Sequence, residues 1–393
     1  MHQSSPYPVD LPAVLERVHA IGREVVAPHA DAVDREARFP REAFAALREA
    51  KLLSAYVPVE YGGMGLNLKD LAKICEILGQ YCASSAMIFA MHQIQVACIV
   101  HHALGEAFFR DYVRELATRQ YLLASATTEL GIGGDLRSSI CAVKVEGERF
   151  TLEKQAPVIS YGEAADAILV TCRKSEAAAR SDQVQVLVRR DDYSLKPLSG
   201  WDTLGFRGTC SLGFVLSSAG NVEQILPVPY ASIHGKTMHP FAHIVWGSLW
   251  LGLATDALAR AKTAVRAEAR KNPGVIPISA VRLAEADLVL FAMRSALDLT
   301  IAEYENLLLE DAADAFSRFG FALRINNLKI SASQQVVDVV SRAMLICGIA
   351  GYRNDSKLSL GRHLRDAIGA GLMVNNDRIL NHNATMHIGQ REG

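Results

Sequence analysis

The stretch Thr127-Thr128-Glu129-Leu130-Gly131-Ile132-Gly133-Gly134-Asp135 marks the point where the texture of this 393-residue sequence changes from helical to β-rich. Its glycines follow a Thr-Glu pair and do not open a helix, as the glycines of a phosphate-binding loop would. Neither G-x-G-x-x-G nor G-x-x-x-x-G-K-[ST] occurs in the chain. The sequence therefore excludes a fold in which a dinucleotide is held by a strand–loop–helix unit.

The sequence before this stretch has a helical pattern. Apolar residues recur at three- and four-residue spacing, first at Val14, Val18 and Ile21, and the pattern continues to about Arg119. One loop rich in glycine, Pro58–Gly65, interrupts it. We therefore expect helices throughout this part of the chain.

The sequence after the stretch is β-rich as far as about Val228. Short runs of strand-forming residues alternate with clusters of Gly, Asp, Ser and Pro, which is the pattern of an antiparallel barrel or sandwich. A charged, alanine-rich segment, Arg173–Asp182, is expected to be a hairpin loop. This interpretation excludes a parallel sheet in the middle third. The expected strands are Ala142–Val145, Phe150–Leu152, Ala167–Cys172, Val184–Val188 and Leu212–Leu216.

Long helices return in the last third of the chain, and their length is typical of antiparallel bundles. The second and third of them carry apolar residues beyond one helical face, which predicts self-association. The order along the chain is helical, then β-rich, then helical, without an internal repeat. The expected helices are Val245–Arg270, Val281–Glu310, Ala312–Leu345 and a fourth from about Leu364 to the end.

The composition is that of an ordinary globular protein. Half of the residues are hydrophobic, 21% are charged and the net charge is −1, so no basic excess indicates nucleic acid or an acidic membrane surface. The richest apolar run, Phe241–Ala254, is too short for a membrane span, and the N-terminus lacks the pattern of a signal peptide. We expect a cytoplasmic protein. Its seven cysteines include no C-x-x-C pair, which favours buried thiols over a zinc site.

Four separated stretches resemble motifs of the acyl-CoA dehydrogenase superfamily, in the same order and across nearly the whole chain. The segment Pro58–Gly65 is similar to P-x-x-Y-G-G-x-G, and Thr128–Asp135 is similar to T-E-P-G-A-G-S-D. The segment Gly205–Thr209 is similar to G-x-R-G-[ST]. The fourth stretch combines Cys347–Tyr352 with Arg365-Asp366-Ala367.

The resemblance implies an α+β fold with an N-terminal α-helical domain (1–120), a central antiparallel β-barrel (121–230) and a C-terminal four-helix bundle (231–393). It also implies a flavin, with the ring between barrel and bundle. Members of the family are usually homotetramers in which a neighbouring chain contacts the adenine half of FAD. In this sequence the residues that would contact the adenine half match the family poorly. Arg270, Gly348 and Gly351 are kept, whereas the usual phenylalanine and glutamines are absent.

Several residues match positions that meet the flavin ring. Thr127 and Thr128 fall where the family contacts the pyrimidine edge, which gains negative charge on reduction. Ser160 falls where a hydroxyl lies near the N5 atom of the flavin. The alternatives are a threonine that satisfies its own backbone and an ordinary strand serine.

Three residues match positions near the substrate. Gly134 stands where the family usually has a serine that contacts the CoA part of the substrate, and Asp135 follows it. The loss of the serine weakens the case for ordinary CoA binding. Arg207 either supports the fold or lines the site, and the sequence does not decide between these.

The position of the usual catalytic glutamate is occupied by Val374, so the usual proton acceptor is missing. The neighbouring Asn375 and Asn376 are able to hydrogen-bond a ligand but not to act as bases. The second position where some members keep a base falls near His243 and holds no carboxylate either. Candidates for a replacement base are His243, His92, Asp377 and His382, because imidazoles and carboxylates accept protons near neutral pH.

The missing glutamate and the poorly matched adenine contacts favour an oxygenase over a dehydrogenase. Some relatives use reduced flavin and O₂ to hydroxylate carbon or nitrogen, a reaction that needs a dry pocket and no carboxylate base. Such an enzyme would take reduced FAD or FMN from a flavin reductase and oxygenate a small or thioester-bound substrate. The alternatives are an acyl-CoA dehydrogenase with a relocated base and a catalytically silent subunit of a mixed oligomer.

Overall fold

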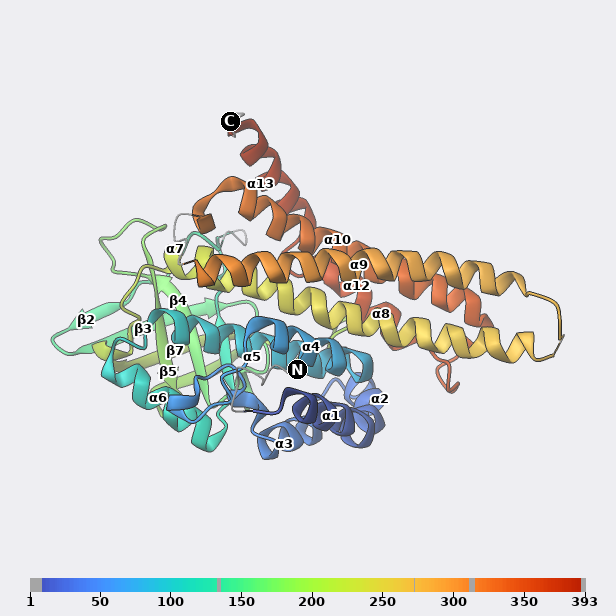
Figure 1. The fold of residues 1–393 in the computed structure, drawn as a ribbon. Helices are drawn as coiled ribbons and strands as arrows, with labels where there is room; N and C mark the ends of the chain where they lie inside the picture. Colours follow the sequence, from blue (N-terminus) through green and yellow to red (C-terminus); the bar gives the residue numbers. More distant parts are fainter. Residues whose placement is uncertain (1–8, 133–135, 272, 311–314, 390–393) are drawn as a thin grey trace, which may run out of the picture.

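The computed structural model describes residues 9–132, 136–271, 273–310 and 315–389. Helices form the first part of the chain and lie together below the long helices of the last third (Figure 1). The last of them ends at Arg119, as the sequence predicts. The helices are α1 (Leu11–Ile21), α2 (Ala27–Arg35), α3 (Arg41–Glu49), α4 (Leu68–Tyr81), α5 (Ala83–His102) and α6 (Ala107–Arg119).

Seven strands in two small sheets form the middle of the described chain. One sheet has the order β1-β4-β5 and the other β2-β3-β7-β6. Along β3 exposed and buried residues alternate strictly, so one face of its sheet packs inward. The strands are β1 (Leu123–Ala126), β2 (Lys144–Glu146), β3 (Arg149–Ala156), β4 (Ala167–Arg173), β5 (Gln183–Arg189), β6 (Tyr193–Ser199) and β7 (Gly213–Asn221).

The sheets correct the expected antiparallel barrel in two ways. The described residues form two open sheets and no closed barrel. In addition, β1 pairs parallel to β4, with Leu123 opposite Ala167, so the expectation that the middle third holds no parallel pairing is wrong. The hairpin β2–β3 stands between these two strands in sequence and allows the chain to return in the same direction. The predicted hairpin loop between β4 and β5 is confirmed by their antiparallel pairing.

Long helices pack on one another in the last part of the chain (Figure 1). The expected fourth helix is broken in two, because Val374 has a left-handed backbone with φ +44° and this conformation ends a right-handed helix. The division of the chain into three domains stays a prediction. The helices are α7 (Tyr230–Ile233), the π-helical turn η8 (His234–Met238), α8 (His239–Ala269), α9 (Ile278–Leu309), α10 (Phe319–Cys347), α11 (Ile349–Tyr352), α12 (Gly361–Leu372) and α13 (Asn376–Gly389).

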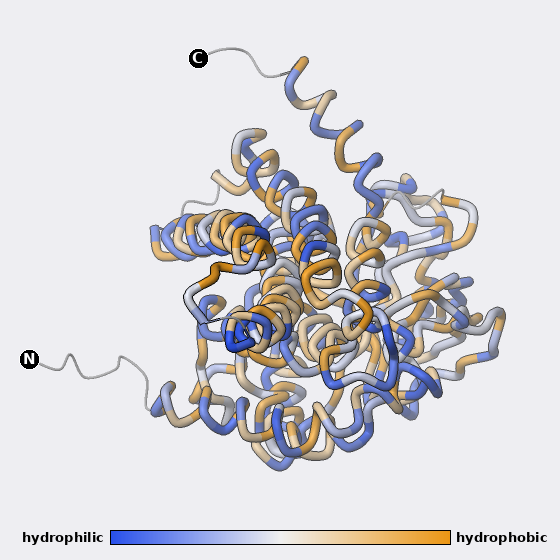
Figure 2. The backbone as a smooth tube through the Cα atoms, turned by 90° about the vertical axis from the view of Figure 1, so that its right-hand side faces the viewer, coloured by the Kyte–Doolittle hydropathy of each residue, from blue (hydrophilic) through white to orange (hydrophobic). Residues whose placement is uncertain are grey.

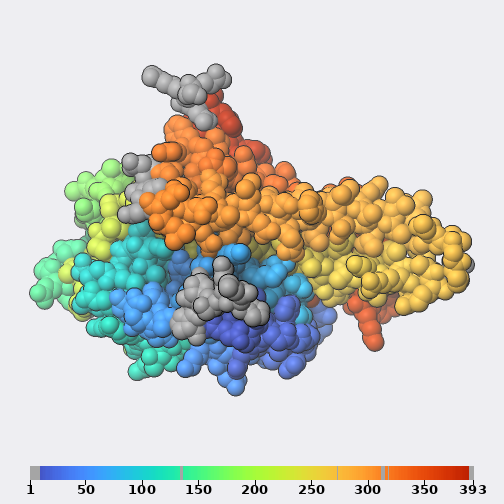
Figure 3. Space-filling view, in the orientation of Figure 1, coloured from blue at the N-terminus to red at the C-terminus, as the bar shows by residue number. Residues whose placement is uncertain are grey.

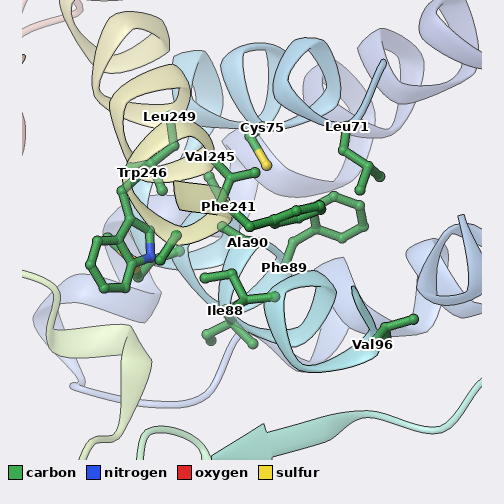
Figure 4. Packing of buried hydrophobic residues seen from close by; sticks show 14 of the residues in the cluster. Leu71, Cys75, Ile88, Phe89, Ala90, Val96, Phe241, Val245, Trp246 and Leu249 are labelled. Atoms are coloured by element: carbon green, nitrogen blue, oxygen red, sulfur yellow. The ribbon is translucent and has the colours of Figure 1, made fainter. Parts of the chain in front are cut away.

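The core lies where α4, α5 and α8 meet, and their apolar side chains interdigitate there (Figure 4). Two glycines allow α4 and α8 to approach closely. A Cβ atom on Gly252 would lie 2.0 Å from the carbonyl oxygen of Glu76, and one on Gly79 would lie 2.3 Å from that of Leu249. Any side chain at either position would therefore push the two helices apart.

The most apolar long helix is α5 and not the run Phe241–Ala254. Among the described residues it is the one helix whose length and composition would suit a membrane span, with a mean hydropathy of 1.5. However, 89% of that segment is buried in the fold, and Figure 2 shows such apolar helices in the middle of the molecule. Packing therefore accounts for its apolar surface. All seven cysteines are free and six are buried, as the sequence predicts.

The motif Arg365-Asp366 joins three parts of the chain. The Arg365 guanidinium forms an ion pair with Asp34 on α2 and donates to the Leu204 carbonyl over 2.9 Å. The Asp366 carboxylate accepts a hydrogen bond of 2.6 Å from the Phe206 backbone. The loop between β6 and β7 reaches α12 because Gly205 has no side chain, since a Cβ there would lie 2.2 Å from the Arg365 carbonyl oxygen.

One face of α9 is apolar and exposed. This helix lies at the surface of the arm that the long helices form (Figure 3), and its core-facing residues, such as Met293 and Leu297, lie on the opposite side. Exposed apolar stripes of this size indicate an interface. The stripe consists of Ile278, Val281, Leu288, Phe291 and Leu299, each more than half exposed.

We predict that the chain self-associates through this stripe, as a homotetramer or at least a dimer. The double variant Leu288→Glu and Phe291→Glu should shift the protein toward monomer, because charges would be buried in the interface. Light scattering at about micromolar concentration measures this. As a control, Val145→Glu changes an exposed valine of β2 and should leave the assembly intact. A monodisperse monomer in the unmodified protein would contradict the prediction.

Candidate functional site

A cavity of about 410 Å³ lies between β1, the loop after β3, helix α5, the start of α8 and the turn between α12 and α13. Its size is within the range of small-molecule sites. None of its described lining residues is a carboxylate, and Arg378 is the only one with a permanent charge. They are Met91, Ile94, Gln95, Ser125, Thr127, Thr128, Leu136, Val158, Ser160, His234, Met238, His239, Ala242, His243, Trp246, Leu372, Val374, Asn375 and Arg378.

The cavity brings together five residues that the sequence singled out: Thr127, Thr128, Ser160, His243 and Val374. They come from three regions far apart in the chain, and Asn375 joins them. This is the grouping that the family resemblance predicts. Their roles stay predictions, because no ligand marks the site.

The hydroxyls of Thr128 and Ser160 are held by the protein. Thr128 Oγ1 donates to the Val158 carbonyl over 3.3 Å. Ser160 Oγ lies 2.8 Å from Ser211 Oγ, which lies 2.8 Å from Thr209 Oγ1. Thr209 in turn donates to the Phe206 carbonyl. The chain of hydroxyls therefore fixes Ser160 at the cavity wall and connects it to the loop that Asp366 holds.

Glu129, the acidic residue of the quoted motif, shapes the loop after β1. Its carboxylate accepts hydrogen bonds from the Ser139 hydroxyl and from the backbone of Ile140 and Cys141, at 2.6 to 3.2 Å. Lys154 on β3 lies 3.6 Å from it and is fully buried. The carboxylate and its partners lie outside the cavity, so Glu129 is a structural anchor that positions Thr127 and Thr128.

The π-helical turn η8 sets the histidine wall of the cavity. In this turn the His239 amide donates to the His234 carbonyl five residues earlier, so these two side chains come to lie one above the other, whereas an α-helix would place them on different faces. Their rings stack at 5.4 Å, and His239 meets His243 edge-on at 4.5 Å. Three imidazoles therefore line one wall.

Two contacts support the π turn. The Lys236 carbonyl accepts a hydrogen bond of 3.0 Å from the Tyr304 hydroxyl. The Thr237 hydroxyl is paired with His102 Nε2 at 2.8 Å. These two contacts tie the turn to α9 and α5.

The three imidazoles are neutral at physiological pH. Burial lowers the pKa of His234 to about 3 and of His239 to about 4, and it lowers the pKa of His243 well below its usual range. The nearby cations Arg137 and Lys329 act in the same direction. Such rings are weak proton acceptors, although they remain good hydrogen-bonding groups.

Val374 lines the cavity from a strained turn. A β-branched residue at φ +44° is rare and costs about 1–3 kcal/mol. Its carbonyl accepts a hydrogen bond of 3.0 Å from the Lys329 ammonium, which also donates to Asn376 Oδ1 over 2.7 Å. Lys329 on α10 is fully buried, and burial lowers its pKa to about 8. The ammonium is therefore mostly protonated at neutral pH and holds the turn.

The two asparagines beside Val374 have different positions from those expected. Asn375 lines the cavity, but its Oδ1 caps α13 by accepting from the backbone of Asp377 and Arg378. Asn376 points away toward α10, where its Nδ2 donates to Ser333 Oγ over 3.0 Å. Both therefore serve the turn, and the expectation that Asn376 meets a ligand is corrected.

The remaining candidate bases are corrected in the same way. His92 lies outside the cavity, and its nitrogens are taken by the Leu53 carbonyl at 2.7 Å and the Leu123 amide at 2.9 Å. It fastens β1 to the first part of the chain. Asp377 and His382 lie on α13 and do not line the cavity. Of the four candidates, His243 alone is at the site.

Several expected contacts lie elsewhere. The Arg207 guanidinium donates to the carbonyls of Asp34 and Thr203 and pairs with Asp202, so its role is structural. Arg270 follows α8 at the far end of the long helices (Figure 1), and Gly348 and Gly351 do not line the cavity. Gly134 and Asp135 lie outside the described residues.

Sequence reasoning missed four residues of the site: Gln95, His234, His239 and Lys329. The first three depend on spatial packing and on the π turn, for which the sequence carries no local pattern. Lys329 gave a signal, since a lysine stands between apolar residues on the buried face of α10. Polar residues on such a face indicate a specific partner.

Comparisons with known proteins agree with this arrangement. The N-terminal domain of the acyl-CoA dehydrogenase family matches residues 10–135. Cyclohex-1-ene-1-carbonyl-CoA dehydrogenase from Syntrophus aciditrophicus is 24% identical over 367 residues, which cover 90% of this chain and 84% of that protein. Residues 10–135 thus match the N-terminal domain of this family, and the chain is similar to members of the acyl-CoA dehydrogenase superfamily over about 90% of its length. The family resemblance that the motifs indicated is thereby confirmed.

Relatives within the superfamily differ in their reactions. The amino sugar nitrososynthase DnmZ from Streptomyces peucetius is 24% identical over 355 residues, covering 86% of this chain and 84% of that protein. The structure of KijD3 in complex with dTDP has a TM-score of 0.83 and 19% identity, over 98% of this chain and 99% of KijD3. FMN-bound TdsC from Paenibacillus sp. A11-2 has a TM-score of 0.81 and 18% identity, over 98% of both chains. Dehydrogenases and oxygenases thus share this fold.

We predict that Lys329→Met loosens the turn at Val374. The variant loses two charge-assisted hydrogen bonds and should lower the free energy of unfolding by about 1–3 kcal/mol, as measured by urea denaturation. The matched control is Lys262→Met on the exposed side of α8, which should change it by less than about 0.5 kcal/mol. Equal stability of both variants would show that Lys329 does not support the turn.

We also predict that the fold is sensitive to acid. Seven histidines have pKa values lowered by burial: His92, His101, His102, His234, His239, His243 and His363. Above about pH 6.5 they are neutral in both states; as the pH falls toward about 4 only the unfolded chain takes up their protons. Stability is therefore lost in this window, by about 1.4 kcal/mol per pH unit for each proton. An unchanged urea midpoint between about pH 7 and pH 5 would contradict this.

Proposed function

We propose that this chain is a flavin-dependent monooxygenase built on the acyl-CoA dehydrogenase fold. The single observation that carries the proposal is the composition of the cavity wall. No described lining residue is a carboxylate, the usual base position is Val374, and the three imidazoles that face the cavity have lowered pKa values. Dehydrogenation of a thioester needs a base for the α-proton, whereas oxygenation does not.

The residues of the cavity fit a flavin ring. Thr127, Thr128 and Ser160 offer hydroxyl and backbone groups along one wall, and Ile94, Val158 and Trp246 supply apolar surface. A flavin needs fixed hydrogen-bond donors at the edge where charge develops on reduction and apolar contacts on its faces. FMN is bound in the structural neighbour TdsC, and both FMN and FAD are compatible with these contacts.

The chemistry would use O₂ and a supply of electrons. One substrate, one O₂ and the two electrons and two protons of a reduced flavin give the hydroxylated substrate, water and oxidised flavin. The protein contributes a cavity with apolar walls that excludes water, and neutral hydrogen-bonding groups near the ring. The poorly matched adenine contacts favour reduced flavin delivered by a separate reductase.

The second candidate is an acyl-CoA dehydrogenase with His243 as its base. The relatives that are dehydrogenases and the Thr128-Glu129 pattern favour it. Against it stands the low pKa of His243, which makes the ring a weak base. A non-catalytic subunit is the third candidate, and it would hold no flavin. Localisation in the cytoplasm and the homotetramer belong to the proposal as well.

Val374→Glu tests the missing base directly. The carboxylate would enter the cavity that Thr128 and Ser160 also line, and a general base contributes about 10²–10⁴-fold to such a proton transfer. We expect this variant to bleach oxidised flavin when butyryl-CoA is added without O₂. We also expect its O₂-dependent activity to fall, because a charge enters a dry pocket.

The matched control is Val374→Gln. Glutamine has nearly the shape of glutamate but no carboxylate, so this variant should not bleach the flavin. Bleaching in the unmodified protein would show that a base is present elsewhere and would overturn the monooxygenase proposal in favour of the dehydrogenase. A protein that retains no flavin under any condition would favour the non-catalytic subunit.

A further inference from the structure

The histidine wall contains hydrogen-bonding atoms that the fold does not use. His243 Nδ1 lies 3.2 Å from the Ile325 carbonyl oxygen, an atom that only accepts. Nδ1 must therefore carry the proton of the neutral ring. The other nitrogen, Nε2, then has a lone pair, and no described residue donates to it. His243 thus offers the cavity a hydrogen-bond acceptor.

His239 offers a second acceptor by the same argument. Its Nε2 lies 2.8 Å from Asn326 Oδ1, and the Asn326 amide Nδ2 donates to Asn383 Oδ1 over 2.7 Å. With the amide in this orientation, His239 Nε2 is the donor and Nδ1 keeps the lone pair. The Asn326–Asn383 pair therefore fixes the tautomer of a ring that lines the cavity.

Gln95 faces the same space from α5. Its side chain is 4% exposed, its Oε1 is buried without a partner, and no hydrogen bond of its amide is formed within the described residues. An unsatisfied buried amide destabilises a fold. By contrast Gln93, two residues earlier, donates to the carbonyls of Leu52 and Leu53 and serves the fold.

We infer that the cavity takes a substrate that donates hydrogen bonds at its buried end, an amine or a hydroxyl compound and not a plain acyl chain. Two imidazole rings with an unused lone pair, those of His239 and His243, line the cavity, and no described lining residue is acidic. An aliphatic chain would leave both acceptors unsatisfied, whereas an N–H or O–H group satisfies them. This inference rests on the proposed function, because it names the substrate class of the same cavity.

Binding of three probes to the full chain tests the inference without any turnover. Aniline, phenol and toluene share one ring and differ in a single group, and isothermal titration calorimetry measures their affinities. We expect aniline and phenol to bind about tenfold more tightly than toluene, since one or two hydrogen bonds contribute this much. In His243→Phe and His239→Phe, which keep a ring and each remove one acceptor, the ratio should fall, and in the double variant it should be about one.

Toluene binding as tightly as aniline in the unmodified protein would overturn the inference. Absence of measurable aniline binding, or an unchanged ratio in both histidine variants, would overturn it as well. These outcomes are separate from the proposed function. If the protein discriminates the probes but its flavin is bleached by butyryl-CoA, the inference about the substrate stands and the proposal of a monooxygenase is wrong.

Discussion

The neighbouring residues Arg365, which is half-buried, and Asp366, which is buried, are the constraint on which the arrangement of the site depends. The guanidinium holds Asp34 of α2, and the carboxylate holds the backbone of Phe206 in the loop between β6 and β7. Burial raises the pKa of Asp366 to about 6, so this carboxylate remains charged at neutral pH only because its surroundings compensate for desolvation. From the same loop, the hydroxyls of Thr209, Ser211 and Ser160 continue to the cavity. Fold and site thus share one network.

Much of the architecture follows from local patterns. The periodicity of apolar residues predicts the helices before Arg119 and the long helices after it, and the alanine-rich segment predicts the hairpin loop between β4 and β5. The parallel partner of β1 does not follow, because a strand of four residues, three of them small, carries no information about which strand it will meet. The break at Val374 does not follow either. A valine favours helix or strand, and the left-handed turn exists only because Lys329 and the cap at Asn375 support it.

The residues of the candidate site were also only partly predictable from the sequence. Thr128, Ser160, His243 and Val374 were placed by the family motifs, and the cavity brings them together. Motifs do not distinguish residues that build a site from residues that face its ligand: His92 and Arg207 satisfy backbone groups, and Asn376 pairs with Ser333. The reverse error concerns Gln95 and His239. Gln95 Oε1 and His239 Nδ1 have no hydrogen-bond partner within the described residues, and a sequence does not record unmade contacts.

The π turn at His234–Met238 affects how the lining of such a cavity changes in evolution. A π turn amounts to an α-helix with one extra residue. Deletion of a single residue there would restore the α-helical register, turn His234 away from His239 by more than a quarter of a revolution, and leave α8 and its core packing unchanged. The loss of one codon would therefore change the lining of the cavity without changing the scaffold. On such a scaffold, insertion and deletion offer a route to new ligands that point substitution in a packed helix does not.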